Sequence, residues 1–212
     1  MSKYNIFALI LVMVVVSLIG FCVENVFISF SVGYMNNRNM VLPFLWGYGL
    51  GILALLLLFG TPDAPRFISK ELNFASPIGG IVYYFCVSFI CVSLGEMILG
   101  HLIEYTCDII WWDYTRIPLN ITKYTSVPTS LGFASLITVF MKYCFEPLIS
   151  AFSRMNPQAL RVLAICFVVA LSIDMLNSLL YMITNHNTLE IWRITFSNNP
   201  KTAIKALFLR NC

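Results

Sequence analysis

The chain has 212 residues, of which 59% are hydrophobic and only 11% are charged, and its formal net charge is +3. An ordinary soluble domain carries about 25% charged residues, so this chain has too few charges to cover a surface that faces water. A lipid bilayer removes the conflict, because it favours apolar side chains on the outside of a helix. The composition therefore excludes a soluble domain, and the small net charge gives no support to nucleic acid as a partner.

Five apolar windows follow one another along the chain, each close to the length of about 20 residues that a membrane-spanning helix needs. They cover approximately residues 5–30, 43–60, 77–105, 130–150 and 159–183. The first continues well beyond the apolar core of a signal peptide, so we interpret it as an uncleaved span. The sequence predicts an all-α integral membrane protein: a bundle of about five transmembrane helices, with a long loop between the third and fourth spans. An odd number of spans places the two termini on opposite sides of the membrane.

We predict one transmembrane helical domain over residues 1–183 and a basic tail over residues 184–212. Basic and aromatic residues alternate in the tail, as in segments that lie on an anionic membrane surface, although an ordinary solvated tail is the alternative. Positive charges are balanced between the two sides of the membrane, so they do not fix the orientation. The seven cysteines include no CxxC pair, and we expect neither a metal site nor another cofactor.

Several ionisable residues lie within the apolar windows, where they are expensive and often functional. Glu96 and Asp174 each lie nine residues before the end of their spans, which places both about 13 Å below the same membrane surface. Glu24 lies six residues before the end of the first span, about 9 Å deep on that side. Lys142 and Glu146 are spaced i, i+4 and are expected to neutralise each other. Three carboxylates therefore converge in depth on one half of the membrane.

The two loops on that side contain Arg38, the segment Trp111-Trp112-Asp113-Tyr114-Thr115-Arg116, and Asn120. Arginines are natural partners for buried carboxylates, and paired tryptophans are found at membrane interfaces more often than in substrate platforms. Glu96, Gly100 and Glu104 share one helix face. The residues predicted to line one polar cavity are Glu24, Arg38, Glu96, Glu104, Trp112, Asp113, Arg116, Asn120 and Asp174. Their carboxylates are candidates for a ligand or ion pathway, for structural ion pairs, or for acid–base chemistry.

These residues resemble a known family, the ABC-transporter type IV membrane proteins, or CmpB-like permeases. The resemblance covers approximately residues 10–180 and is most specific at Trp111 to Tyr114. It also includes Glu24, Asn37-Arg38, Pro43-Phe44, Tyr48 to Gly51, Glu96, Gly100, Glu104, Pro118, Asn120 and Asp174. Asn39 and Leu42 stand where the family has glycines, so the first loop is expected to turn differently here. The resemblance implies a multi-pass protein of a bacterial cytoplasmic membrane.

The leading functional hypothesis is a permease-like transport component with a one-sided cavity of carboxylates and arginines. The alternatives are a membrane-embedded enzyme that acts at the lipid interface and an assembly or regulatory subunit without transport activity. A transporter of this kind requires a separate ATPase or another membrane subunit as its partner, because this chain contains no GxxxxGK[ST] phosphate-binding loop. The sequence favours a protein that is not itself an enzyme and names no substrate.

Overall fold

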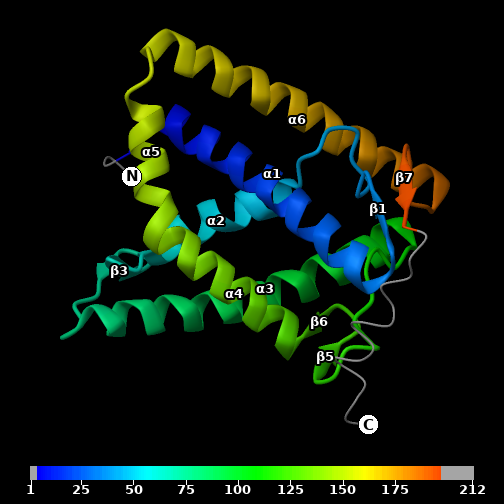
Figure 1. Cartoon of the computed structure of the whole chain (residues 1–212), viewed down its shortest axis with the longest axis horizontal. Coiled ribbons are helices and arrows are strands. Elements are labelled where there is room, and N and C mark those ends of the chain that lie inside the picture. The colour runs from blue at the N-terminus through cyan, green and yellow to red at the C-terminus, as the bar shows by residue number, and fades with distance from the viewer. Residues whose placement is uncertain (1–3, 197–212) are drawn as a thin grey trace.

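The computed structural model describes residues 4–196, and its elements are named as in Figure 1. The helices are α1 (Ile6–Ser31), α2 (Trp46–Phe59), α3 (Pro77–Cys107), α4 (Val127–Val139), η1 (Phe140–Cys144), α5 (Phe145–Ser153) and α6 (Pro157–Asn185). Because α4, η1 and α5 form one continuous helix over residues 127–153, five helical segments follow one another, as the apolar windows predicted. Four of the five are long and apolar enough to cross a membrane. The predicted fold class is confirmed: the protein is an all-α membrane protein.

Helix α1 is the central element of the bundle, with half of its most apolar stretch buried by the rest of the protein. It begins where the Asn5 side chain accepts a hydrogen bond from the amide of Phe7, a usual N-terminal cap. Both α2 and α6 pack along it, and α5 meets its first turns (Figure 1). Side chains on the outer faces of the other helices, such as Ile78 and Ile98, remain more than 60% exposed. Such apolar exterior surfaces are those that a bilayer would cover.

Helix α2 is shorter than the predicted second window. It has 14 residues, about 21 Å at helical rise, against a hydrocarbon thickness of about 30 Å. The chain leaves α1, turns, and returns in non-helical form to the level of Ser17, whose carbonyl accepts the amide of Leu45 at 3.0 Å. Helix α2 begins there, with Gly49 so close to the Met13 carbonyl that a Cβ atom would lie 2.5 Å from it. We call residues 37–45 the return segment, because they carry the backbone back into the bundle before α2 begins.

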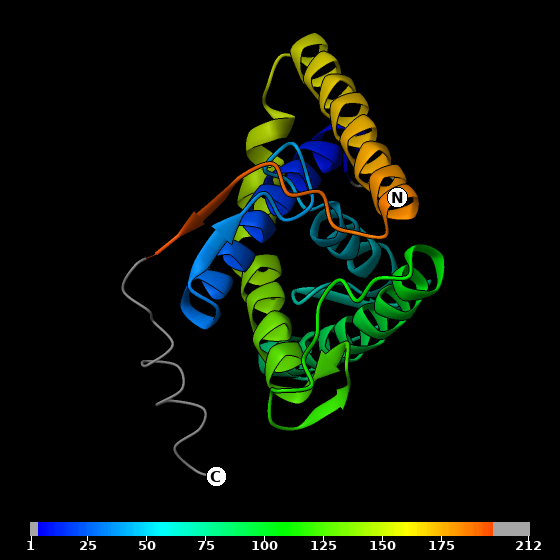
Figure 2. The ribbon, with the colours of Figure 1, turned by 90° about the vertical axis from the view of Figure 1, so that its right-hand side faces the viewer.

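Residues 4–196 contain seven short strands, six of them in the connections between helices and one after α6. The strands are β1 (Tyr34–Asn36), β2 (Gly60–Thr61), β3 (Ala64–Phe67), β4 (Lys70–Glu71), β5 (Asn120–Thr122), β6 (Thr125–Ser126) and β7 (Arg193–Thr195). Strands β2, β3 and β4 form one small antiparallel sheet between α2 and α3, and β5 pairs with β6 before α4. Strand β7 pairs with β1 (Figure 2), so residues 186–196 of the predicted tail fold against the loop after α1. The rest of that tail lies outside the described residues.

The fourth span contains a π-helical turn at η1, a feature that inserts one extra residue into a helix and is often found at functional sites. Within this turn, Lys142 forms an ion pair with Asp63 of the β2–β3 turn. Glu146 accepts a hydrogen bond from the Tyr4 hydroxyl at 2.5 Å. The prediction that Lys142 and Glu146 neutralise each other was therefore wrong, because Lys142 reaches a charged partner from another connection.

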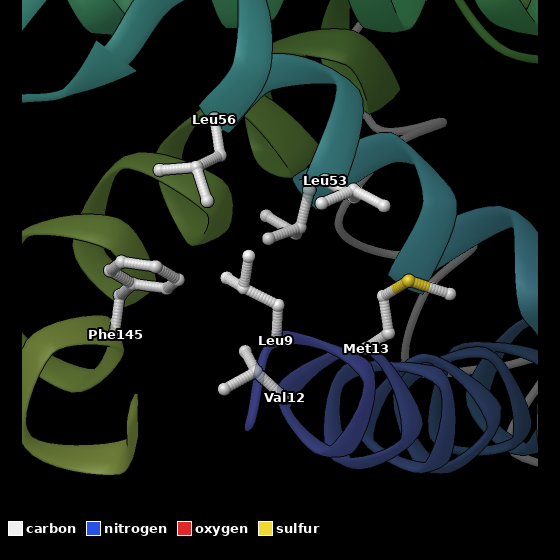
Figure 3. A pocket seen from close by; sticks show the side chains of 7 residues that line it. Leu9, Val12, Met13, Leu53, Leu56 and Phe145 are labelled. Carbon is white, nitrogen blue, oxygen red and sulfur yellow. The ribbon is translucent and has the colours of Figure 1, made fainter. Parts of the chain in front are cut away.

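The main core is apolar and joins α1, α2, η1, α5, the first half of α6 and Tyr84 of α3. Figure 3 shows a small space within it, with Leu9 and Val12 of α1 facing Leu56 of α2 and Phe145 of α5. Its volume of about 10 Å³ is at the lower limit for one water molecule and too small for a solute. The side chains of Tyr84 and Ser88 are fully buried at the edge of this core, and their hydroxyls have no hydrogen-bond partner among the described residues.

The unpartnered hydroxyl of Tyr84 leads to a first prediction. A buried polar group without a partner costs about 1–3 kcal/mol, so its removal from a site of unchanged shape should stabilise the fold. We expect Tyr84→Phe to raise the midpoint of thermal unfolding in detergent. Tyr143→Phe is the matched control, because Tyr143 is 65% exposed and its replacement should leave the midpoint unchanged. A fall in the midpoint for Tyr84→Phe would mean that the hydroxyl has a partner in the membrane.

Candidate functional site

An ion pair between Glu24 and Arg38 lies at the centre of the candidate site. The Nη2 and Nε atoms of Arg38 lie 2.6 and 2.8 Å from the same carboxylate oxygen, and the Tyr48 hydroxyl donates to the other oxygen at 2.9 Å. The side chains of Arg38 and Glu24 are 17% and 25% exposed. Arg38 and Asn39 adopt positive φ angles of 50° and 65°, which are uncommon for residues with a side chain. This left-handed turn directs Arg38 back toward α1, although the glycine expected from the family pattern is absent.

The carboxylate of Glu96 lies near this ion pair but has hydroxyl partners. Thr125 donates to Glu96 Oε2 at 2.9 Å, and the Thr125 oxygen lies 3.1 Å from that of Ser130. The Tyr114 phenol of the long loop lies close to Glu96. Burial raises the pKa of the Tyr114 phenol far above its ordinary value, and the charges of Glu96 and Glu24 raise it further. The structure therefore brings Glu24, Arg38 and Glu96 into one group with Tyr48, Tyr114 and Thr125, which we call the carboxylate cluster.

A second group surrounds Glu104, two helical turns further along α3. Lys123 donates to one of its carboxylate oxygens at 2.5 Å, and the Tyr124 hydroxyl donates to the other at 2.7 Å. The hydrogen bond to Glu104 raises the pKa of the Lys123 ammonium group. Gly100 makes room for Tyr124, since a Cβ atom there would lie 2.3 Å from the Tyr124 ring. Trp112 fixes the same loop by donating from Nε1 to the Tyr124 carbonyl at 2.8 Å.

The remaining predicted residues of the long loop are exposed. Asp113 Oδ1 accepts the amide of Thr115 at 2.8 Å, and this bond holds the pKa of the Asp113 carboxyl below its usual range. Arg116 is exposed and lies near Asp113, so it does not serve as the expected counter-charge of the buried carboxylates. Asn120 opens β5 and is paired with Ser126. The sequence did not predict that Lys123 is the cationic partner of Glu104. Lys123 follows β5 and turns back toward α3.

Asp174 contacts backbone amides. Its two oxygens accept the amides of Val41 and Leu42 at 2.8 and 2.9 Å, and the residue is only 6% exposed. It therefore binds the return segment to α6. Asn37 and Asn39 join the same segment to the chain after α6, through hydrogen bonds with the backbone of Leu189 at 2.8 and 2.6 Å. The structure does not join Asp174 directly to the carboxylate cluster: the contacts connect the two through the return segment.

The arrangement positions acidic, basic and phenolic groups but no obvious metal centre. Within residues 4–196, no three His, Cys, Asp or Glu side chains come together as metal ligands would. The C-terminal ends of α1, α3 and α6 lie on one side of the molecule (Figure 1), where β1, β5, β6 and β7 also gather. Both carboxylate groups occur in the second halves of α1 and α3. Proton exchange and the binding of a cationic or hydrogen-bonding solute are the chemistry that such groups support.

Comparison with known proteins gives one match. The sequence model of the family described as "Putative ABC-transporter type IV" matches residues 11–179, which is most of the chain and includes the carboxylate cluster, Glu104 and Asp174. Searches of curated proteins and of solved structures give no match. The matched range agrees with the resemblance seen in the sequence, and the chain belongs to the family of Putative ABC-transporter type IV proteins.

Proposed function

We propose that this protein is the permease-like membrane subunit of a transport system and that its carboxylate cluster binds the solute or exchanges protons during transport. The observation that carries the proposal is the surroundings of Glu96. Its carboxylate accepts a hydrogen bond from the Thr125 hydroxyl and lies close to the Tyr114 phenol. No ion pair among the described residues includes it. A carboxylate at membrane depth without a resident cation is suited to accept a proton or a cationic group.

The return segment gives independent support. Non-helical backbone at membrane depth is tolerated where it is buried in protein or lines a cavity. Many transporters place their substrate sites beside helices that are interrupted in this way. Here the return segment leads directly into α2, and its residue Arg38 reaches Glu24 of the carboxylate cluster. A movement of this segment would therefore change the ion pair beside Glu96.

Energy for transport has to come from a partner. The sequence contains no phosphate-binding loop of the GxxxxGK[ST] kind, so a separate ATPase or another membrane subunit is part of the proposal. The test is purification of the protein from its native membrane after mild cross-linking, followed by identification of co-purifying proteins. We expect an ATP-hydrolysing subunit whose activity depends on this protein. Repeated recovery of the protein alone, with no effect of its deletion on any solute flux, would contradict the proposal.

Glu96→Gln should separate a functional role from a structural one. The amide keeps the shape and can accept the hydrogen bond from Thr125, but it cannot bind a proton or carry negative charge. Because Glu96 has no cation partner that the substitution would leave unpaired, we expect the melting point to change little. Transport or coupled ATP hydrolysis should fall at least about tenfold, which corresponds to a free-energy change of about 1.4 kcal/mol. Glu71→Gln is the matched control on the exposed strand β4. Full activity in Glu96→Gln would exclude proton exchange at this residue.

A further inference from the structure

An apolar groove lies between α1, α5 and α6, away from the carboxylate cluster. Its volume is about 260 Å³, below the usual range of about 300–1,000 Å³ for small-molecule pockets. The lining residues are Leu11, Val14, Val15, Leu18, Phe44, Phe152, Met155, Leu163 and Phe167. None of them has a polar side chain that could orient a polar ligand. The groove therefore suits a flexible hydrocarbon chain.

The groove extends from one membrane surface toward the middle of the bilayer. Met155 lies in the turn between α5 and α6, at the surface end. Phe167 lies ten residues into α6, which corresponds to a depth of about 15 Å, half of the hydrocarbon thickness. There its ring packs against that of Phe44, with centroids 6.0 Å apart, and closes the inner end. The groove thus has the direction and the depth of an acyl chain in one leaflet.

Two arginines border the surface end. Arg154 caps α5 and is a direct neighbour of Met155, which lines the groove. Arg161 is exposed on α6, and its guanidinium lies 5.4 Å from the centre of the Phe7 ring, one turn before Leu11 on α1. Neither arginine forms an ion pair with another described residue. Basic residues between transmembrane helices are a common site for the phosphate of an anionic lipid.

We propose that this groove is a binding site for one anionic phospholipid, with an acyl chain between α1 and α6 and its phosphate at Arg154 and Arg161. The site goes beyond the proposed transport function, because its two arginines lie at the end of α5 and near the start of α6, whereas the carboxylate cluster involves the second halves of α1 and α3. The lipid fills the space between α1 and α6 where the side chains do not meet. It therefore couples the position of α6, and with it Asp174, to the composition of the membrane.

Native mass spectrometry of the protein purified in detergent tests this site. Phosphatidylglycerol or phosphatidylcholine is added at equal concentration, and retained lipids are counted. We expect one phosphatidylglycerol molecule to be retained in preference to phosphatidylcholine. Each of Arg154→Gln and Arg161→Gln should weaken phosphatidylglycerol retention about fivefold, the effect of one basic residue near an anionic headgroup, and Lys70→Gln on β4 should not.

Filling the groove should displace the acyl chain. Leu163→Trp, at a position that is 40% exposed, is expected to abolish retention of the single lipid. Leu176→Trp introduces the same side chain on an exposed face of α6 and is the control. Thermal unfolding of each variant shows whether the fold is intact, and Val14→Phe gives a second filled groove. The proposal would be overturned by equal retention of the two lipids or by unchanged retention in the variants with a filled groove. A change of oligomeric state in these variants would also overturn it, and would assign the groove to a second copy of the chain.

Discussion

Replacement of Asp174 by alanine is expected to lower the free energy of unfolding by about 3–5 kcal/mol, because two backbone amides lose the charged acceptor that a buried side chain supplies. The amides belong to Val41 and Leu42, which lie 2.8 and 2.9 Å from the two carboxylate oxygens. In a helix, each amide would bond to its own backbone. The return segment is not helical, and a bilayer offers no water to replace the lost acceptor.

Asp174→Asn should have about half of this effect, since the amide side chain keeps one oxygen that accepts a backbone hydrogen bond. Asn177→Ala is the control, because Asn177 is exposed on α6 three residues later and surface changes usually stay within about 0.5 kcal/mol. The measurement is reversible unfolding in mixed micelles, together with the yield of folded protein in membranes. Wild-type stability in Asp174→Ala, combined with a loss of transport, would place Asp174 in the functional site and not in the scaffold.

The helices could be predicted from the sequence because a helix that crosses a bilayer needs a long run of apolar residues, and such runs are visible in the sequence. The predicted third and fifth windows, 77–105 and 159–183, end within two residues of α3 and α6. The second window, 43–60, was predicted longer than α2, because residues 43–45 are apolar like α2 but are not helical. Hydropathy measures the preference of side chains for lipid, but it does not distinguish helical from extended backbone at the same depth.

The candidate site could be predicted in part. Counting residues from the span ends placed Glu24 and Glu96 at similar depths, and in the structure both lie near the Tyr114 phenol. Partner choice was harder, because it depends on the path of each loop. Lys123 pairs with Glu104 only because β5 and β6 form a hairpin that turns it toward α3. The partners of Asp174 are backbone amides, which no pattern of side chains reveals.

Arg38→Gln is the second substitution for which a large effect is expected, and it tests whether the Glu24 ion pair belongs to the scaffold. Removal of one member of a buried ion pair costs about 3–5 kcal/mol. Here the two side chains are 17% and 25% exposed, so the pair is only partly buried. We therefore expect a smaller loss, of about 2–3 kcal/mol, with a similar loss in Glu24→Gln.

The double variant distinguishes an ion pair from two independent contributions. If the pair is the common cause, Glu24→Gln combined with Arg38→Gln should cost clearly less than the sum of the single changes. Glu190→Gln breaks the exposed pair with Arg193, in which the charged atoms lie 3.5 Å apart, and should cost less than about 1 kcal/mol. Additive losses would show that Arg38 stabilises the return segment by other contacts. Suppose that the losses of stability are not additive and that Glu96→Gln leaves the stability unchanged. The two carboxylates then have different roles: Glu24 holds Arg38 and Tyr48 in place, and Glu96 is free to exchange its proton or bind the solute.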